Sequence, residues 1–184
     1  MSSTAPPTII RAARDDEFTT IGKVDALACA DNAMYQILWG KLDPAIASQF
    51  KWIDGAKADV AKGHHTVLVL ERTDNGEIAG LAWFWKYSKE NPPMPPSGGY
   101  PDGFNNSESD KLVFPRFHFE QELMDKWGEF IYVHEVLAIA PACQLRGLGK
   151  KLMLHIIESA KKERLNIMLT AAAGKPPFYE KLGL

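Results

Sequence analysis

Hydrophobic and polar positions follow two different spacings along this chain, and each spacing predicts its own set of elements. Apolar residues in alternating or continuous runs, rich in β-branched and aromatic types, predict strands at 8–11, 66–71, 78–87, 130–139 and 165–170. Apolar residues at helical spacing predict two short helices within 17–39, broken near Asp31-Asn32, and further helices at 44–62, 117–127 and 148–160. Between the second and third strands, Thr73-Asp74-Asn75-Gly76 predicts a hairpin turn.

Three segments fall outside these spacings. Residues 1–7 indicate a disordered lead-in before a single domain at 8–184. Acidic residues at 15–17 are expected in the first turn of the first helix, where the helix dipole favours them. Residues 88–115 are rich in proline and glycine and are predicted to exclude regular structure. This insert is either a lid over the substrate, anchored by Tyr100 and Phe104, or a mobile surface loop.

Composition narrows the class of protein. The chain has 184 residues, 46% of them hydrophobic and 24% charged, which suits one globular domain with a sizeable core. A formal net charge of −2 without a basic patch argues against nucleic acid as a partner. Apolar runs are too short to span a bilayer, no signal-peptide stretch follows Met1, and Cys29 and Cys143 lie far apart. We therefore expect a cytoplasmic protein with reduced thiols and no membrane partner.

The segment 144–149, Gln-Leu-Arg-Gly-Leu-Gly, lies between a predicted strand and a predicted amphipathic helix. Two glycines allow a sharp turn and close approach of the main chain to a ligand. The start of the helix presents unpaired N–H groups and the positive end of the helix dipole. Arg146, Lys150 and Lys151 add full positive charges. This segment is therefore predicted to bind an anion, and a diphosphate is the natural occupant.

Two common phosphate-binding motifs are excluded by spacing, because the chain has neither a Gly-x-x-x-x-Gly-Lys-Ser/Thr nor a Gly-x-Gly-x-x-Gly sequence. The Gln-x-x-Gly-x-Gly pattern at 144–149, preceded by Val-Leu-Ala-Ile-Ala-Pro at 136–141, resembles the acetyl-CoA-binding motif of the GNAT N-acetyltransferase superfamily. A second resemblance lies at 177–184, where Pro-Phe-Tyr-Glu-Lys-Leu-Gly-Leu is similar to that family's closing helix and its Phe-Tyr-Glu-Lys signature. Together the two matches cover about residues 130–184.

The resemblance implies an α/β fold, with a central, mixed, mostly antiparallel twisted sheet that has helices on both faces. The motif strand and the next strand would run parallel and splay apart to form a slot for acetyl-CoA. The pantetheine arm would lie along the motif strand and the pyrophosphate on the main chain of about 145–150. On this basis the cofactor-binding residues are Leu137, Ala138, Ile139, Gln144, Leu145, Arg146, Gly147, Leu148, Gly149 and Lys150.

Acetyl transfer to an amine needs a base and an acid. Glu135 is the candidate base, because a carboxylate in so apolar a strand is costly unless it is solvated or paired. The alternative is a strand glutamate paired with a nearby Lys or Arg. Tyr179 is the candidate acid, because the resemblance places its hydroxyl near the leaving sulfur. The alternative is a tyrosine that only packs the last helix.

The remaining candidates are weaker. The histidines show no zinc-ligand spacing, so no metal is expected. Cys143 beside the phosphate segment is either a reactive thiol or, more commonly, a small buried one. Trp83, Trp85 and Tyr87 share one strand face, which lines an acceptor pocket or packs in the core. The resemblance also places Met34, Tyr35, Leu38 and Trp39 at the acceptor site.

These observations predict an acetyl-CoA-dependent N-acetyltransferase that acts on a small-molecule primary amine by direct transfer in a ternary complex. One alternative is a protein or peptide N-acetyltransferase, and the other is a non-catalytic acyl-CoA-binding module. The family usually continues into final strands that are missing after Leu184. A sheet without them would leave an open edge. Either the chain is truncated at Leu184, or the fold closes differently, for example through a homodimer that covers this edge.

Overall fold

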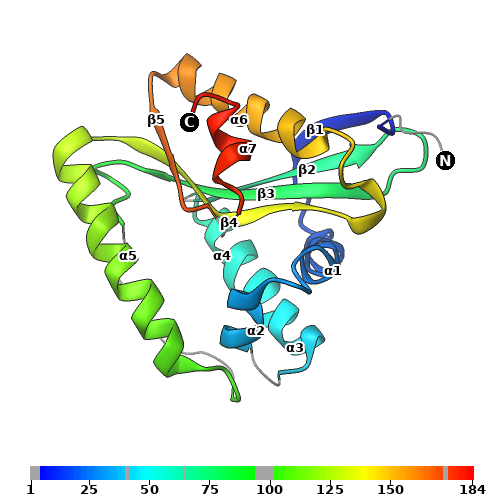
Figure 1. The fold of residues 1–184 in the computed structure, drawn as a ribbon, viewed down its shortest axis with the longest axis horizontal. Helices are drawn as coiled ribbons and strands as arrows, with labels where there is room; N and C mark the ends of the chain where they lie inside the picture. Colours follow the sequence, from blue (N-terminus) through cyan, green and yellow to red (C-terminus); the bar gives the residue numbers. More distant parts are fainter. Residues whose placement is uncertain (1–4, 40–41, 64, 94–101, 172–173) are drawn as a thin grey trace.

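The computed structural model describes residues 5–39, 42–63, 65–93, 102–171 and 174–184, and at 44, 112, 113 and 132–135 it describes the main chain alone. Within these residues the strands form one sheet, shown in Figure 1, in the order β1 (Thr8–Ala12), β2 (His65–Arg72), β3 (Ile78–Tyr87), β4 (Phe130–Ile139) and β5 (Asn166–Leu169). Strands β1 to β4 are antiparallel to their neighbours, and β5 runs parallel to β4. The predicted mixed, mostly antiparallel sheet is confirmed.

Helices cover both faces of this sheet (Figure 1), as predicted. The crossover helix α6 (Leu148–Glu163) and the short α7 (Pro176–Glu180) lie on one face, and the N-terminal helices lie on the other. The alternation of side chains along β2 explains the two cores, because successive residues point to opposite faces. Leu68 and Leu70 pack in the cluster that contains α6, whereas Val67 and Val69 pack with the first helix.

The N-terminal layer consists of α1 (Phe18–Ala28), α2 (Ala33–Trp39), α3 (Pro44–Ser48), the π-helix η1 (Gln49–Lys57) and α4 (Ala58–Ala61). The predicted pair of helices with a break near residues 31 and 32 is confirmed. Residues 44–61 are helical as expected, but nine of them form a π-helix, a rare form that short sequence patterns do not reveal. Gly22 allows α1 and α3 to approach closely, because a Cβ at this position would lie 2.0 Å from Ser48 Oγ.

The prediction that residues 88–115 exclude regular structure is wrong for the last ten of them. Helix α5 spans Asn106–Trp127 and contains Pro115 in its interior. Asn105 caps its start by accepting a hydrogen bond from Glu108 N (3.3 Å), and Ser109 is buried on its inner face. Pro115 lies on the exposed side of the helix, where the carbonyl that loses its partner can be hydrated. The helix predicted at 117–127 is therefore the second half of a longer one.

Phe104, one of the two residues expected to anchor this insert, is 8% exposed and packs edge-on against Trp39 of α2, with ring centroids 4.9 Å apart. Tyr100, the other, lies outside the described residues. The anchoring contact of Phe104 ties the segment before α5 to the N-terminal layer. Its role as a lid stays a prediction.

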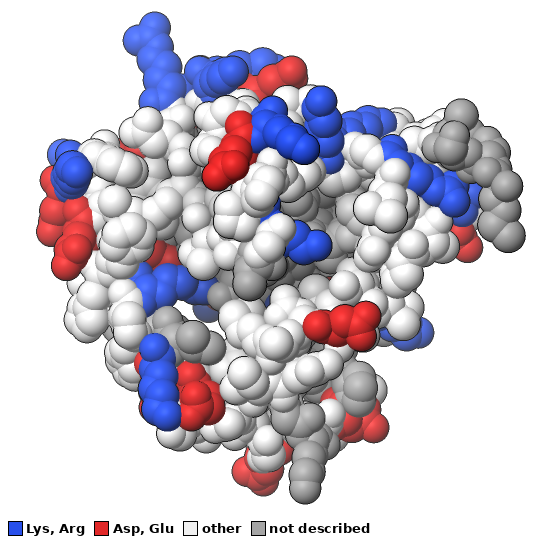
Figure 2. Space-filling model, viewed as in Figure 1, with Lys and Arg blue, Asp and Glu red and all other residues white. Residues whose placement is uncertain are grey.

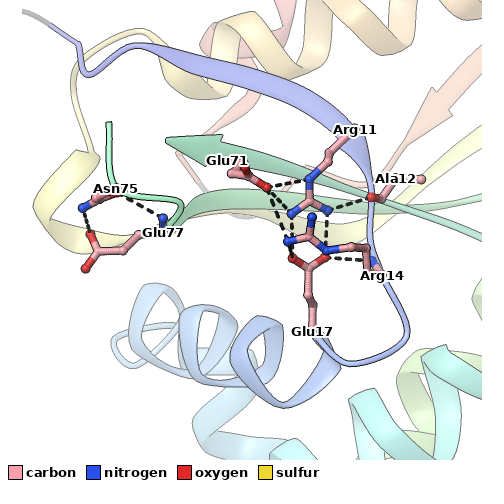
Figure 3. Close-up of polar contacts among 7 residues, drawn as sticks. All are labelled: Arg11, Ala12, Arg14, Glu17, Glu71, Asn75 and Glu77. Carbon is pink, nitrogen blue, oxygen red and sulfur yellow. Dashed lines mark hydrogen bonds and ion pairs between the residues drawn. The ribbon is translucent and has the colours of Figure 1, made fainter. Parts of the chain in front are cut away.

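The first helix starts at Phe18, so the acidic residues 15–17 precede its first turn instead of occupying it. Glu17 is held by two arginines, as Figure 3 shows: Arg11 Nη2 donates to Glu17 Oε1 (2.6 Å), and so does Arg14 Nη2 (2.7 Å). Arg11 also binds Glu71 of β2 through Nε (2.6 Å). These hydrogen bonds and charges hold the pKa of Glu17 at about 2, and they raise the pKa of Arg11 above its usual value. The network joins β1, β2 and α1.

Candidate functional site

The site predicted from the sequence lies where β4 loses its second neighbour. Strand β5 pairs with β4 only from Phe130 to Val133, whereas β4 continues to Ile139 along β3. Half of the main-chain groups in an antiparallel pair face away from the neighbour. Along 136–139 these groups therefore form an edge without a strand partner among the described residues. We call this stretch the β4 edge.

A bulge in β4 marks the start of this edge. Trp83 of β3 pairs with Val136, but the next residue, Phe84, pairs with Val133, so two residues of β4 have no counterpart. These two residues are His134 and Glu135. Bulges bend a strand and increase its twist, and they are common next to active sites. The main chain of the predicted base Glu135 therefore lies within this bulge. Its side chain lies outside the described part of the structure.

Beyond the β4 edge, the short helix η2 (Pro141–Cys143) leads into the predicted anion-binding segment. Gln144 Nε2 donates to Ile139 O (2.9 Å), which ties this segment back to β4. Gly147 has a left-handed conformation (φ 78°) directly before α6, and Leu145 is also left-handed (φ 58°) and fully exposed. The sequence therefore explains the turn: only glycine adopts this conformation at Gly147 without steric cost.

Main-chain N–H groups converge at this turn. Gln144 N donates to Pro141 O and Lys151 N donates to Gly147 O, but none of the six N–H groups at 145–150 has an acceptor among the described residues. The helix that follows has no acidic residue in its first turn. Six free donors at the positive end of a 16-residue helix are suited to bind an anion.

Full charges surround these donors. Figure 2 shows that basic side chains gather along the edge formed by α6 on this face of the molecule. Arg146, Lys150 and Lys151 lie at the start of α6 beside these donors, whereas Lys161, Lys162 and Arg164 lie at its far end. Lys151 is partly engaged, since its Nζ donates to Thr8 Oγ1 (2.9 Å). Arg146 and Lys150 are exposed, so they add a long-range field more than a rigid contact.

Helix α7 brings the predicted acid to the same region. A Cβ on Gly149 would lie 3.9 Å from Phe178 Cζ and 3.8 Å from Ile139 Cγ1, so α7, the start of α6 and the end of β4 are in direct contact. Tyr179 is partly buried against the core beneath α6. Burial raises the pKa of the Tyr179 hydroxyl above its usual value, so the group keeps its proton at neutral pH.

The aromatic row on β3 lies on the opposite face of the sheet. Trp83, Trp85 and Tyr87 contact one another edge-on, with centroids 6.2 and 5.8 Å apart, which confirms that they share one face. Trp83 and Tyr87 are buried, and Trp85 is partly buried. Arg116 of α5 lies over the Trp85 ring at 5.1 Å. Because Trp83 pairs with Val136, this row reaches the start of the β4 edge from the side opposite α6.

Sequence reasoning missed a polar group inside the N-terminal layer. Asp25 of α1 is 2% exposed and accepts hydrogen bonds from Lys51 Nζ (2.8 Å) and Trp52 Nε1 (2.9 Å) of the π-helix. Tyr35 of α2 donates to the same carboxylate (3.3 Å). No short spacing joins these residues, which are up to 27 positions apart. The one signal was an aspartate on the apolar face of a predicted helix.

Cys143 is buried and Cys29 is partly buried, and neither forms a disulfide within the described residues. The commoner of the two readings of Cys143, a small buried thiol, is therefore confirmed. Of the helices in the described part of the chain, none combines the length and the apolar character that crossing a bilayer requires.

Comparison with known proteins identifies the class. Residues 116–183 match the family model described as an acetyltransferase (GNAT) domain. This match covers β4, the anion-binding segment, α6, β5 and α7, the elements that build the site. Over residues 116–183 the chain therefore matches a GNAT acetyltransferase domain, which confirms the resemblance drawn from the two sequence motifs. A comparison with curated protein sequences finds no match.

Solved structures show that the fold extends over nearly the whole chain. The chain is similar to an acetyltransferase from Clostridium acetobutylicum determined with acetyl-CoA (TM-score 0.57, 13% identity, 97% of this chain and 90% of that chain). It is also similar to a mosquito arylalkylamine N-acetyltransferase like 5b (TM-score 0.67, 17%, 96% and 82%). A third similar structure is a histone acetyltransferase HPA2 and related acetyltransferase from Corynebacterium glutamicum (TM-score 0.59, 16%, 96% and 83%). At these identities the likeness shows the fold alone.

Proposed function

We propose that this protein is an acetyl-CoA-dependent N-acetyltransferase that acetylates a primary amine of a small molecule by direct transfer. The observation that carries the proposal is the continuity of the β4 edge with the six free N–H groups at 145–150. The pantetheine arm of acetyl-CoA is extended and rich in amides, and it leads to a diphosphate. The β4 edge offers hydrogen-bonding groups to the arm, and the N–H groups at 145–150 offer donors to the diphosphate. The acetyl-CoA in the similar Clostridium acetobutylicum structure supports this choice of acyl donor.

In the proposed complex, the N–H groups at 145–150 hold the pyrophosphate, with Arg146 and Lys150 beside it. The β4 edge at Leu137, Ala138 and Ile139 pairs with the amides of the pantetheine arm. A main-chain N–H on this edge also polarises the thioester carbonyl, since a positioned donor stabilises the oxyanion that forms there. Each of these roles uses the main chain, so the side chains mainly set the shape of the slot.

The chemical step needs two proton transfers. The acceptor nitrogen, in its neutral form, forms a bond to the thioester carbonyl carbon, and the carbon–sulfur bond then breaks. Tyr179 gives its proton to the departing thiolate; its raised pKa means that the hydroxyl is protonated when the thiolate forms. Glu135, at the bulge, takes the proton lost by the amine, directly or through one water. No covalent enzyme intermediate is formed.

Two acceptor classes compete. Among similar structures, one is named for arylalkylamines and one for histone acetylation. The aromatic row on β3 favours a small acceptor with an apolar or aromatic part, because Trp83, which pairs with Val136, brings this row to the start of the β4 edge. Phe104 packs against Trp39 and so holds the segment before α5 against α2. This contact also favours a small acceptor over a protein.

The test combines binding with turnover. Isothermal titration should show acetyl-CoA binding, and thiol release should then occur on a panel of small primary amines but not on lysine-containing peptides. Release on peptides alone would replace the proposal with protein acetylation. Binding without release on any acceptor would indicate a non-catalytic module.

The role of Tyr179 is tested in the same assays. Tyr179→Phe should lower kcat by about 10- to 100-fold, the usual size of a lost proton transfer, without changing acetyl-CoA affinity. Phe178→Leu, a neighbouring substitution on α7 that removes no hydroxyl, is the matched control for packing. Equal losses in the two variants would reduce Tyr179 to a packing residue.

A further inference from the structure

A hollow of about 180 Å³ lies in the N-terminal layer, between α1, α2 and residues 42–51, which include α3 and the start of η1. We propose that this hollow is a second small-molecule site, distinct from the β4 edge, and that Tyr35 and Trp39, which the resemblance places at the acceptor site, belong to this second site instead. It takes a small, mostly apolar molecule that ends in a carboxylate or another hydrogen-bond-accepting group. Three features of the hollow favour such a ligand: its polar end, its largely apolar walls and its separation from the β4 edge.

The polar end consists of Asp25 and the donors around it. The Asp25 side chain is 3% exposed, and its two oxygens are bound by Lys51, Trp52 and Tyr35. Cys29 Sγ adds a weaker contact (3.4 Å). A buried carboxylate with so many donors is fully satisfied, so it does not need a ligand and has no capacity to bind one.

Lys51 is different, because it stands between Asp25 and the solvent. Its side chain is 14% exposed and lines the hollow. An ammonium group has three N–H donors. One is directed to Asp25 and a second to the Tyr35 hydroxyl. Among the residues that the structure describes, the third has no acceptor, so a ligand in the hollow meets a free charged donor.

This arrangement selects the end group of the ligand. A cationic amine would be repelled by Lys51 and would find the Asp25 oxygens already occupied. A carboxylate or a carbonyl oxygen instead accepts the third N–H, and a charge-assisted hydrogen bond is stronger than a neutral one. The preference is therefore opposite to the one expected of an amine-acceptor pocket.

The remaining walls are small or apolar apart from Gln36, whose Nε2 donates to Ala30 O (3.1 Å). Ala26 and Ala47 leave the space open, and Trp39 and Leu42 close it. A ring or a short branched chain of about ten non-hydrogen atoms suits such a volume. The ligand class is thus a small aromatic or aliphatic acid or its neutral carbonyl analogue.

The hollow is separated from acetyl transfer by two indoles. Trp52, which is 0% exposed, packs against Trp83 with centroids 5.3 Å apart, and Trp83 pairs with Val136 at the start of the β4 edge. Lys51 and Trp52 both belong to the π-helix, a form that occurs often at functional sites. The rare helix is therefore placed where it presents two consecutive residues to Asp25.

The experiment is a two-dimensional amide NMR titration of the protein without acetyl-CoA, so that its outcome is independent of transferase activity. Three probes share one ring and differ in their end group: phenylacetate, phenylacetamide and phenethylamine. We expect phenylacetate to shift the Gly22, Ala26 and Trp52 indole signals with a Kd of about 1 mM, a usual affinity for so small a ligand. Phenethylamine should bind these residues at least about tenfold more weakly.

Cavity-filling variants locate the site without touching the ion pair. Ala26→Leu should weaken phenylacetate binding at least about tenfold. The matched control is Ala142→Leu, the same substitution in a separate hollow of about 440 Å³ beside η2, which should leave the Kd unchanged. Lys51→Met should abolish the preference for phenylacetate over phenethylamine.

Three results would overturn the proposal. One is the absence of shifts with both phenylacetate and phenylacetamide. Another is equal binding of phenethylamine at the same residues. The third is a loss of binding in Ala142→Leu together with its retention in Ala26→Leu. Binding of phenylacetamide as strongly as phenylacetate supports a carbonyl ligand, and stronger binding of phenylacetate supports an acid.

Discussion

The two proposed sites of this molecule offer different groups to a ligand. The C-terminal half, from β4 to α7, offers main-chain groups that have no partner among the described residues: the β4 edge and the six N–H donors at 145–150. The N-terminal layer offers side chains from three helices that meet at Asp25. Main-chain recognition leaves a compact sequence pattern, since it needs glycines and a turn at fixed spacing. Side-chain recognition across helices leaves no local pattern, which explains why only the first was found from the sequence.

The comparison has an energetic side as well. An unpaired main-chain edge at the surface is solvated and costs little when it is empty. A buried ion pair costs several kcal/mol per charge in lost hydration, which only good geometry offsets. We therefore expect substitutions in the N-terminal layer to change stability most, and substitutions at the C-terminal half to change affinity most. Substitutions in each half separate the effect on stability from the effect on affinity.

Asp25→Leu should lower the free energy of unfolding by about 3–5 kcal/mol, because it leaves Lys51 charged and without its carboxylate in a nearly buried position. Urea denaturation measures the loss. At temperatures where the variant stays folded, its affinity for acetyl-CoA should equal that of the parent protein.

The control for Asp25→Leu is the double variant Asp25→Leu, Lys51→Met. It should recover at least about half of the lost stability, since replacing both members of a buried pair with apolar residues is often close to neutral. If the double variant lost the sum of the two single losses, the pair would not be coupled as the structure indicates.

Glu17 makes the stability of the N-terminal half sensitive to acid. Its pKa is about 2 in the folded protein against an unfolded value of 4.5, so its contribution is fully present above about pH 4.5. It is lost as the pH falls toward 2. A shift of this size corresponds to ~3 kcal/mol of stability for a carboxylate whose side chain is 11% exposed.

Glu17→Gln isolates this contribution. The difference in unfolding free energy between the parent protein and the variant should be largest near neutral pH and should shrink between about pH 4.5 and 2. A difference that stays constant across this range would assign the effect to packing instead of charge. Acetyl-CoA affinity at neutral pH should not change, because the network lies in the N-terminal half.

Gly147→Val tests the C-terminal half. A β-branched residue at φ 78° is strained, and its side chain would also stand in the path of an anion that approaches the free N–H groups. We expect acetyl-CoA affinity, measured by titration calorimetry, to fall about tenfold or more, which equals about 1.4 kcal/mol or more.

Gly63→Val is the matched control for Gly147→Val. Gly63 has nearly the same φ, 79°, and at both glycines an added Cβ would have no atom within 4 Å, but Gly63 follows α4 in the N-terminal layer. The two variants should lose similar stability, and only Gly147→Val should lose affinity. Equal affinities would mean that the turn does not contact the diphosphate.

Some elements of the fold could be predicted from the sequence, and others could not. The strands, the hairpin and the turn at Gly147 were predictable because period-two alternation and glycine positions are local properties. The long helix α5 was not, because the proline-rich segment before it and Pro115 within it hid its helical half. Pro115 is tolerated because it lies on the exposed side of the helix, a fact of tertiary structure that no spacing reveals.

The same limit applies to the candidate site. Gln144 stays a predicted cofactor-binding residue, and the structure adds a positioning contact between its side chain and Ile139 O (2.9 Å). Asp25 and Lys51 were not singled out, because they lie 26 positions apart and only the packing of several helical segments brings the two side chains together. Glu135 and Tyr179 remain predictions of the chemistry, one at a bulge and one with a raised pKa.

Arg146→Ala should produce the smallest effect of these substitutions. It tests whether the C-terminal half binds the diphosphate through main-chain groups alone or also through side chains. If the main chain holds the diphosphate, an exposed arginine adds only a screened attraction, so acetyl-CoA affinity should fall about two- to threefold at low salt. The difference from the parent protein should disappear near 0.5 M salt, where the Debye length is only about 4 Å. Titrations of both proteins with acetyl-CoA at low salt and near 0.5 M salt measure the two affinity differences. A loss of about thirtyfold that persists at high salt would show a direct, desolvated contact between the Arg146 side chain and the phosphates, and the C-terminal half would then recognise its ligand through side chains as the N-terminal layer does.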